Sequence, residues 1–305
     1  MRQTLSLLFS ALLLNLIRDL THASGIPVYR KFFKSIMSST ACADVYVIPM
    51  FDVNYGFIVI DRVTNKAAII DPGEPGPVIY AVRELCAQVE MAFVTHRHGD
   101  HSGGNAAVKE AFPDVEVMGP TYERVRHISK GVSEGDSIIL GSLKIDVLHT
   151  PCHTKGHVVY LVSSNDHHAD VDAADQLLFS GDTLFVGGCG NFNEGTAADM
   201  LKNMDRLGNL PPETQVYCGH EFTLENLQFL STIDTHGSGT SEMLAYVTKK
   251  RETGESTVPT TIGRELEYNL FMKCREPITQ KLLDRQSPTE TMTRLRELRN
   301  QYRSQ

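Results

Sequence analysis

The stretch Thr95-His-Arg-His-Gly-Asp-His101 directly follows a short apolar run and decides how the rest of the sequence is interpreted. It places three histidines and an aspartate within six residues. Imidazole and carboxylate groups bind zinc and iron, and in extended or turning backbone the side chains of His96 and His98 point the same way. Asp100 and His101 follow on the next turn and can face a second ion. The alternative is a polar turn without metal, and the spacing favours a metal site.

Length and charge limit the class of protein. A chain of 305 residues predicts one large core with an addition, and we expect a monomer. The net charge of -8 argues against nucleic acid as a partner. From Lys249 onward, however, twelve Lys and Arg stand against eight Asp and Glu. A basic tail beside an acidic body predicts an anionic substrate.

The first residues differ from the rest. Leu5 to Ile17 is apolar but too short to span a membrane, and residues 1–36 hold five basic groups and one acid. This composition favours a mitochondrial presequence over a secretory signal peptide, with no stable membrane association after processing. Initiation at Met37 would give a cytosolic form. The six cysteines form no Cys-x-x-Cys pair, so we expect free thiols in a reducing compartment.

Alternating and apolar runs predict the elements that carry the metal stretch. Val45–Pro49, Gly56–Asp61 and Ala67–Asp71 are typical of strands and predict an antiparallel start. Pro77–Val89 has apolar residues at helical spacing. Met91–Thr95 is a predicted buried strand whose carboxyl end delivers the metal stretch. Sites in layered α/β proteins form at the carboxyl ends of strands.

Further metal-ligand side chains follow later strands. His153 lies in a Pro-Cys-His-Thr turn after a predicted strand, Asp182 follows another, and His220 follows a third. A single histidine in a loop is usually an exposed residue without a function. Because the metal stretch is present in the same chain, His153 is instead interpreted as a further metal ligand. The two oxygens of Asp182 can reach two separate cations.

Seven ligand groups at strand ends are too many for one ion and fit two. The natural division gives one ion His96, His98 and His153, gives the other Asp100, His101 and His220, and places Asp182 between them.

These motifs resemble those of the metallo-β-lactamase superfamily, whose fold is an αββα sandwich. More narrowly, the chain resembles glyoxalase II, the hydroxyacylglutathione hydrolase family, from residue 45 to residue 302. The motifs that carry this narrower resemblance are Gly181-Asp-Thr-Leu-Phe-Val-Gly-Gly-Cys-Gly190, Phe192-x-Glu-Gly-Thr196, Val216-Tyr-Cys-Gly-His-Glu221, Thr257-Val-Pro-Thr-Thr261 and Glu267-Tyr-Asn-x-Phe-Met272.

The resemblance implies a thioesterase with two divalent ions, zinc first and iron second. It would hydrolyse S-lactoylglutathione to D-lactate and glutathione in methylglyoxal detoxification, with Asp100 and Asp182 orienting the attacking hydroxide. It also implies the ligand division given above. We expect an N-terminal extension over residues 1–43, a catalytic domain over 44–221 and a helical substrate-binding domain over 222–305.

The last helix is predicted from a capping box at Ser287 to Glu290, with proline at its first position. Arg296, Arg299 and Arg303 form a stripe beside its apolar face. One interpretation is a solvated basic edge. The other is a clamp for the carboxylates of a glutathione moiety, because arginine binds a carboxylate with two donors at once. In the family that the chain resembles, a basic pair occupies the positions of Arg296 and Arg299.

Three positions depart from that family. Asn191 and Asn193 stand where it usually has a lysine and a tyrosine, and Phe222 replaces a tyrosine. The family uses all three replaced groups to bind the thiol cofactor. Glutathione therefore remains the first choice and a related glutathione-type thiol the second.

Three other functions are compatible with the metal stretch. A persulfide dioxygenase of the same superfamily uses one iron, but it lacks the helical tail that we expect from Phe222 onward. A metal-dependent nuclease is disfavoured by the acidic body and by the absence of a long basic insertion. A metal-stabilised binding module without catalysis is the third alternative.

Overall fold

The computed structural model describes residues 37–165, 175–234 and 238–303. The targeting hypotheses concern residues 1–36 and lie outside the described part of the chain, as does the side chain of Arg303. Within the described ranges, no helix has both the length and the apolar character needed to cross a bilayer.

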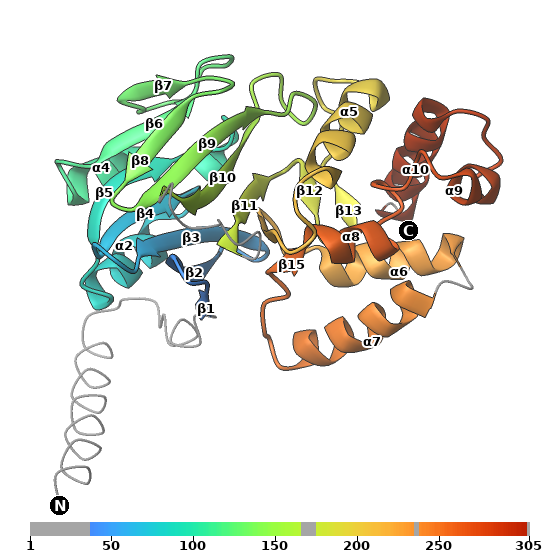
Figure 1. Ribbon diagram of the computed structural model, residues 1–305, viewed down its shortest axis with the longest axis horizontal. Helices are drawn as coiled ribbons and strands as arrows, with labels where there is room; N and C mark the ends of the chain where they lie inside the picture. The colour runs from blue at the N-terminus through green and yellow to red at the C-terminus, as the bar shows by residue number, and fades with distance from the viewer. Residues whose placement is uncertain (1–36, 166–174, 235–237, 304–305) are drawn as a thin grey trace, which may run out of the picture. The chain divides into compact units, whose positions relative to one another are not determined.

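The first sheet has seven strands in sequence order, as Figure 1 shows in blue and green. Its first four strands are antiparallel neighbours, whereas the last three join by parallel pairing. The strands are β1 (Met37–Ser39), β2 (Ala43–Met50), β3 (Asn54–Asp61), β4 (Lys66–Ile70), β5 (Gln88–Phe93), β6 (Glu116–Pro120) and β7 (Lys130–Val132). The predicted antiparallel start is confirmed, and a turn at Thr64 and Asn65 joins β3 to β4.

The second sheet has six strands in the order β15-β14-β11-β10-β9-β8. All neighbours are antiparallel except β11 and β14, which run parallel. The strands are β8 (Ser137–Leu140), β9 (Leu143–His149), β10 (Val158–Ser164), β11 (Leu177–Gly181), β14 (Gln215–Cys218) and β15 (Thr260–Thr261). The short strands β12 (Leu184–Phe185) and β13 (Gly188–Cys189) form a separate hairpin.

Aromatic side chains fill the space between the two sheets. Phe57 of β3 lies 5.3 Å from Phe179 of β11 and 5.6 Å from Tyr217 of β14, measured between ring centroids. Phe93 at the end of β5 lies 5.0 Å from Tyr160 of β10. All five rings are buried, and burial of each such side chain contributes roughly 1.5–3 kcal/mol. This contact stacks the sheets and fixes the end of β5, which precedes the metal stretch.

Helices pack on the sheets and complete the predicted αββα sandwich (Figure 1). Helix α2 (Pro75–Glu84) packs against β2 and β3, and α4 (Asn105–Ala111) packs against β6. The prediction of a helix as far as Val89 was wrong. The helix ends at Glu84 because Cys86 has a φ of +49°, which a right-handed helix cannot accommodate, and β5 begins at Gln88.

The C-terminal part is mainly helical. Thr196 caps α5 (Ala197–Gly208) through a capping box with Asp199, and α5 packs against the last helix, α10 (Pro288–Arg303). The predicted cap of α10 is present in part, because the Glu290 amide donates to Ser287 Oγ and the Ser287 hydroxyl donates to the Glu290 carboxylate. The other helices are α6 (Thr223–Ile233), α7 (Ser238–Glu252), α8 (Ile262–Tyr268) and α9 (Pro277–Leu282).

Candidate metal centre

The metal stretch follows β5 and turns into the single-turn helix α3 (Gly99–Ser102). Hydrogen bonds from the amides of His101 and Ser102 to the His98 carbonyl close this turn. His96 lies in a bend and His98 in extended backbone before the turn, whereas Asp100 and His101 lie within it. This change of backbone sends the two pairs toward different partners, as the spacing predicts.

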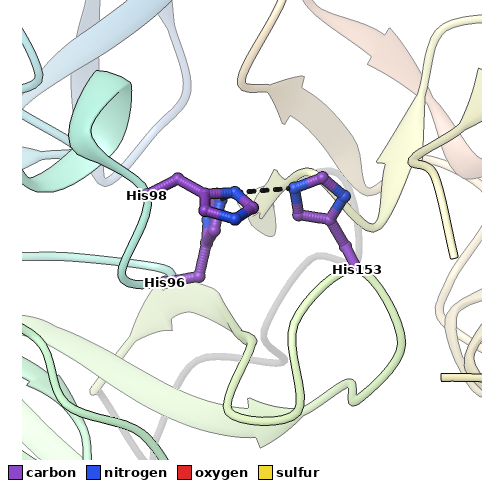
Figure 2. Close-up of side chains that lie close together, drawn as sticks. All are labelled: His96, His98 and His153. Atoms are coloured by element: carbon purple, nitrogen blue, oxygen red, sulfur yellow. Dashed lines mark hydrogen bonds between the residues drawn. The ribbon is translucent and has the colours of Figure 1, made fainter. Parts of the chain in front are cut away.

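The first cluster consists of His96, His98 and His153. The Nδ1 atom of His98 lies 3.0 Å from His96 Nε2 and 3.0 Å from His153 Nε2. Figure 2 shows a ring nitrogen of His98 facing a ring nitrogen of His153, which reaches in from the turn between β9 and β10. Three imidazole nitrogens thus converge on one point.

The second cluster consists of Asp100, His101 and His220. His101 Nε2 lies 3.2 Å from His220 Nε2, and Asp100 Oδ2 lies 3.6 Å from the former and 3.5 Å from the latter. His220 follows β14 in the second sheet, so the two sheets contribute to this cluster together. Each predicted ligand set is brought together as expected.

Asp182 lies between the two clusters. Its Oδ2 is 3.3 Å from His153 Nε2, while its Oδ1 is 3.3 Å from both His101 Nε2 and His220 Nε2. Gly181, which precedes it, has a φ of +48°, and a Cβ there would lie only 2.6 Å from Thr95 Oγ1. Glycine is therefore required to turn the chain so that each carboxylate oxygen faces a different cluster.

The charges of the centre favour a cation. Burial lowers the pKa of His96 and of His153, so these imidazoles are neutral and offer lone pairs. Burial alone would raise the pKa of Asp182, but His220 and His101 hold it well below its usual range. The pKa of His101 is raised well above its usual range despite burial, because Asp182 and Asp71 favour positive charge at its ring.

The donor set fits divalent metal ions. Tetrahedral coordination at 2.0–2.1 Å places ligand atoms roughly 3.3 Å apart. The separations of 3.0–3.3 Å between the converging nitrogens and the Asp182 oxygens are close to that value. Neutral imidazole and carboxylate are also the ligand types that such ions select. The chain therefore holds a divalent metal site.

Asp71 is a functional residue that the sequence prediction missed. Its Oδ2 lies 2.9 Å from His101 Nδ1, and the Thr95 amide and hydroxyl each donate to its carboxylate over 2.7 Å. A carboxylate behind a ligand histidine fixes the tautomer that presents Nε2 to the metal. Its position directly after a predicted strand could have indicated a role at the site. Asp-Pro-Gly after a strand is also common in ordinary turns, however.

Asn54 is a second missed residue. Its Nδ2 donates to Asp100 Oδ2 over 2.8 Å, and its backbone forms an isolated bridge with His220. The first residue of β3 thus supports Asp100 through its side chain and His220 through its backbone. A lone asparagine between two predicted strands carried no signal of this role.

His157, which opens β10, lies behind the first cluster. Its Nε2 accepts a hydrogen bond from the Asp182 amide over 3.0 Å, and its ring stacks on His96 with centroids 4.9 Å apart. Its Nδ1 faces the hydroxyls of Thr150 and Thr183. It therefore positions Asp182 and His96.

A narrow cavity of about 40 Å³ extends from the metal centre toward the C-terminal helices. We call it the inner pocket, and its lining includes His153, Asp182, Phe222, Asn191, Arg296 and Arg299. Phe222 stacks on His220, with ring planes 5° apart and centroids 4.8 Å apart. Four of the predicted substrate contacts thus line a cavity that reaches the metal ligands.

A larger hollow of about 450 Å³, which we call the outer groove, shares Asn191 and Arg296 with the inner pocket. Asn193, Thr293 and Glu297 line it further along. All five predicted substrate residues therefore line one or both cavities. The alternative interpretation of Arg296 and Arg299 as a solvated basic edge does not hold, because these side chains are 6% and 2% exposed.

Comparison with known proteins identifies the family. Residues 49–220 match the model of the metallo-beta-lactamase superfamily, and residues 221–302 match that of the hydroxyacylglutathione hydrolase C-terminus. The cytoplasmic hydroxyacylglutathione hydrolase of Arabidopsis thaliana is 38% identical over 261 residues, which cover 85% of this chain and 99% of that protein. The chain belongs to the hydroxyacylglutathione hydrolase family. The hydroxyacylglutathione hydrolase of Thermosynechococcus vestitus is also 38% identical, over 260 residues that cover 85% of this chain and 99% of the relative.

Solved structures agree with this hydroxyacylglutathione hydrolase fold. A metallo-beta-lactamase from Staphylococcus aureus aligns with a TM-score of 0.56 at 21% identity, covering 86% of this chain and 72% of that one. ETHE1 from Myxococcus xanthus aligns with a TM-score of 0.53 at 25% identity, covering 81% and 98%. The αββα sandwich is therefore shared by proteins well beyond the hydroxyacylglutathione hydrolases.

Proposed function

We propose that this protein hydrolyses S-2-hydroxyacylglutathione thioesters, with S-lactoylglutathione as the first candidate substrate, to a 2-hydroxy acid and glutathione. One structural observation carries the chemistry. Asp182 presents one oxygen to each of two ligand clusters at a distance of 3.3 Å, next to the mouth of the inner pocket. Two clusters that share one carboxylate form the arrangement expected of a two-ion hydrolase.

The residues proposed to hold the ions are His96, His98 and His153 for one, Asp100, His101 and His220 for the other, and Asp182 for both. Zinc is the first choice because imidazole and carboxylate ligands suit it, and iron is the second. When bound, such ions lower the pKa of water and polarise a carbonyl oxygen.

The side chains of the centre orient the reactants. Asn54 holds the Asp100 carboxylate at Oδ2, and His157 holds the backbone of Asp182 through its amide. These two carboxylates accept hydrogen bonds from the attacking water and aim it at the thioester carbonyl. A bond forms between the water oxygen and the carbonyl carbon while one of these carboxylates takes up a water proton, the C–S bond breaks, and its electron pair leaves with the thiolate toward the inner pocket.

No cysteine is needed as a nucleophile. Burial raises the pKa of Cys152 and of Cys189 to about 12, so both are protonated at neutral pH. Both side chains are buried, and the Cys189 carbonyl is the acceptor of a hydrogen bond from Arg296. They serve packing rather than catalysis.

The C-terminal region favours a thioesterase over the dioxygenase considered above. Its residues 221–302 match the hydroxyacylglutathione hydrolase C-terminus and supply the two arginines of the inner pocket. We also propose a division into an extension over 1–43, a catalytic domain over 44–221 and a helical domain over 222–305. Monomeric assembly and mitochondrial import, with a cytosolic form from Met37, are part of the same proposal.

Rates on S-lactoylglutathione, measured with the metal content of the same sample, test the main proposal. We expect thiol release that scales with bound metal and is lost when a chelator removes it. A metal-loaded protein that turns over no glutathione thioester would contradict the proposal. Oxygen consumption with glutathione persulfide would support the dioxygenase instead, and salt-sensitive RNA binding would support the nuclease.

A further inference from the structure

Arg97 lies in the metal stretch between two ligands of the first cluster, His96 and His98. Its side chain pairs with two carboxylates from other loops. Nη2 donates to Glu194, and Nε lies 3.7 Å from Glu123 Oε2. The Arg97 amide also donates to Glu123 Oε1 over 2.6 Å. One arginine therefore ties this part of the metal stretch to the loop before β7 and to the loop before α5.

Glu194 also holds the turn that carries His153. Its carboxylate accepts a hydrogen bond from the Lys155 amide over 2.8 Å, and its own amide donates to the Cys152 carbonyl over 3.1 Å. These bonds fix the backbone on both sides of His153. In the same loop, the Asn191 carbonyl accepts a hydrogen bond from His153 Nδ1 over 3.1 Å, which leaves Nε2 with the lone pair that faces the first cluster.

Glu123 contacts the same turn at Gly156. The Gly156 amide donates to Glu123 Oε2 over 3.2 Å, and a Cβ at Gly156 would lie 2.3 Å from Glu123 Cγ. Only glycine therefore lets the turn approach this side chain so closely. The Glu123 side chain is 5% exposed, so this contact is shielded from solvent, whereas the side chains of Arg97 and Glu194 are partly exposed.

We propose that Arg97, Glu123 and Glu194, which we call the clamp, are positioning residues for the first metal cluster. The clamp joins the metal stretch, which follows the first sheet, to the His153 turn of the second sheet. It thereby sets the separation of His98 and His153 that one ion requires. This inference rests on the proposed function for the presence of an ion at the first cluster, and it adds residues that control the affinity for that ion without touching it.

Zinc affinity, measured against a competing chelator, tests the clamp. In a His220→Ala background the second cluster lacks a ligand, so the bound zinc reports the first cluster. We expect Glu194→Gln and Arg97→Met each to lower this affinity about tenfold or more. In a His98→Ala background, which reports the second cluster, the same changes should alter it by less than about threefold. Equal losses at both clusters would overturn the proposal.

The full chain provides a second measurement if either background loses its zinc. In that case Glu194→Gln should make one of the two zinc ions easier to remove with chelator and leave the other as in the wild type. Zinc removal that is unchanged, or that is easier for both ions to the same degree, would overturn the proposal.

Comparison of the two clamp variants separates position from charge. Arg97→Met makes the surroundings of the first cluster more negative, whereas Glu194→Gln makes them less negative. A purely electrostatic role would therefore shift zinc affinity in opposite directions. We expect both variants to weaken binding, and the double variant to weaken it by no more than about threefold beyond the stronger single variant, because both remove the same contact. Opposite shifts would overturn the proposal.

A matched control is Glu134→Gln. Glu134 also accepts a backbone hydrogen bond from the second sheet, from the His149 amide over 2.6 Å, and it also pairs with an arginine, Arg206. It is not part of the clamp, and its removal should change zinc affinity at the first cluster by less than about threefold. A loss equal to that in Glu194→Gln would indicate general loosening of the second sheet and would overturn the proposal.

Activity at high zinc provides the last measurement. If the clamp acts through metal affinity, excess zinc should restore kcat/KM of Glu194→Gln for S-lactoylglutathione to within about threefold of the wild type. Failure of the proposed function would appear as zinc-loaded wild type without thioester turnover, and the affinity measurements would still decide the role of the clamp. Failure of the inference would appear as clamp variants that bind zinc like the wild type.

Discussion

The metal centre is assembled from side chains that follow strands, whereas the outer groove is lined by a loop and by helix α10. Around the metal centre, buried residues such as Asp71 and His157 hold the ligands in place. Along the groove, Glu297 forms an exposed ion pair with Arg294 and several side chains are partly exposed. The metal ligands are therefore held in one arrangement, whereas the groove constrains its ligand less tightly. Substitutions should have large effects at the first and small effects at the second.

The strongest challenge to this comparison is Asp182→Ala. Loss of the carboxylate that both clusters share should lower kcat/KM for S-lactoylglutathione at least about 1,000-fold, which corresponds to roughly 4 kcal/mol. Metal content measured on the same protein should fall as well. As a control, Asp205→Ala removes an exposed ion pair with Arg275 and should change neither quantity. Wild-type activity in Asp182→Ala would mean that the protein is a binding module.

Asp71→Asn tests whether the residues behind the ligands matter as much as the ligands. Asparagine tolerates the φ of +49° at this position but does not reproduce the charge beside His101. We expect a 10- to 100-fold loss in affinity for metal at the second cluster, measured by titration against a competing chelator. Unchanged affinity would show that His101 is oriented without Asp71.

The prediction for Asn54→Ala is more moderate. Asp100 would lose the hydrogen bond that holds its Oδ2, while the ligands themselves remain. We expect about a tenfold loss in metal affinity at the second cluster and little change at the first, measured by metal stoichiometry at increasing chelator concentration. Asn209→Ala, at the exposed end of α5, is the control. Equal loss at both clusters would indicate a general loss of structure.

The smallest effect is expected at Phe222, which lines the inner pocket. Phe222→Tyr keeps the ring that stacks on His220 and adds a hydroxyl at the inner pocket. One added hydrogen bond to the thiol should lower KM for S-lactoylglutathione about threefold and leave kcat unchanged. A larger change in kcat would mean that Phe222 acts on the metal centre through His220 and not on the thiol.

Much of the centre could be predicted because each ligand carries its own local signal. The stretch from His96 to His101 has a spacing that few other structures explain, and Asp182 and His220 repeat the pattern of a ligand group after a strand. Individual strands followed from alternating runs such as Val45–Pro49, which forms most of β2, whereas the stacking of two sheets was implied by the resemblance to the metallo-β-lactamase superfamily. Local sequence patterns were sufficient to predict a strand or a ligand where the apolar periodicity and the position of the ligand residues indicated the same structure.

The supporting residues could not be predicted in the same way. Asn54 at the start of β3 meets Asp100 after β5 only when the first sheet forms, and nothing near it in sequence marks that contact. Arg299 meets Glu225 where α10 lies near α6, so its side chain is buried and paired within the protein. The charge available to a substrate is thus a tertiary property, because burial and partners decide it.

Because both sheets supply metal ligands, the supply of metal should affect the amount of folded enzyme in a cell. The first sheet supplies His96 to His101, and the second supplies His153, Asp182 and His220. Ions held between them would tie the layers together, and an unfolded chain offers no such site. The free energy of unfolding should therefore rise with the concentration of free metal. Metal scarcity would reduce the number of folded molecules as well as the activity of each one.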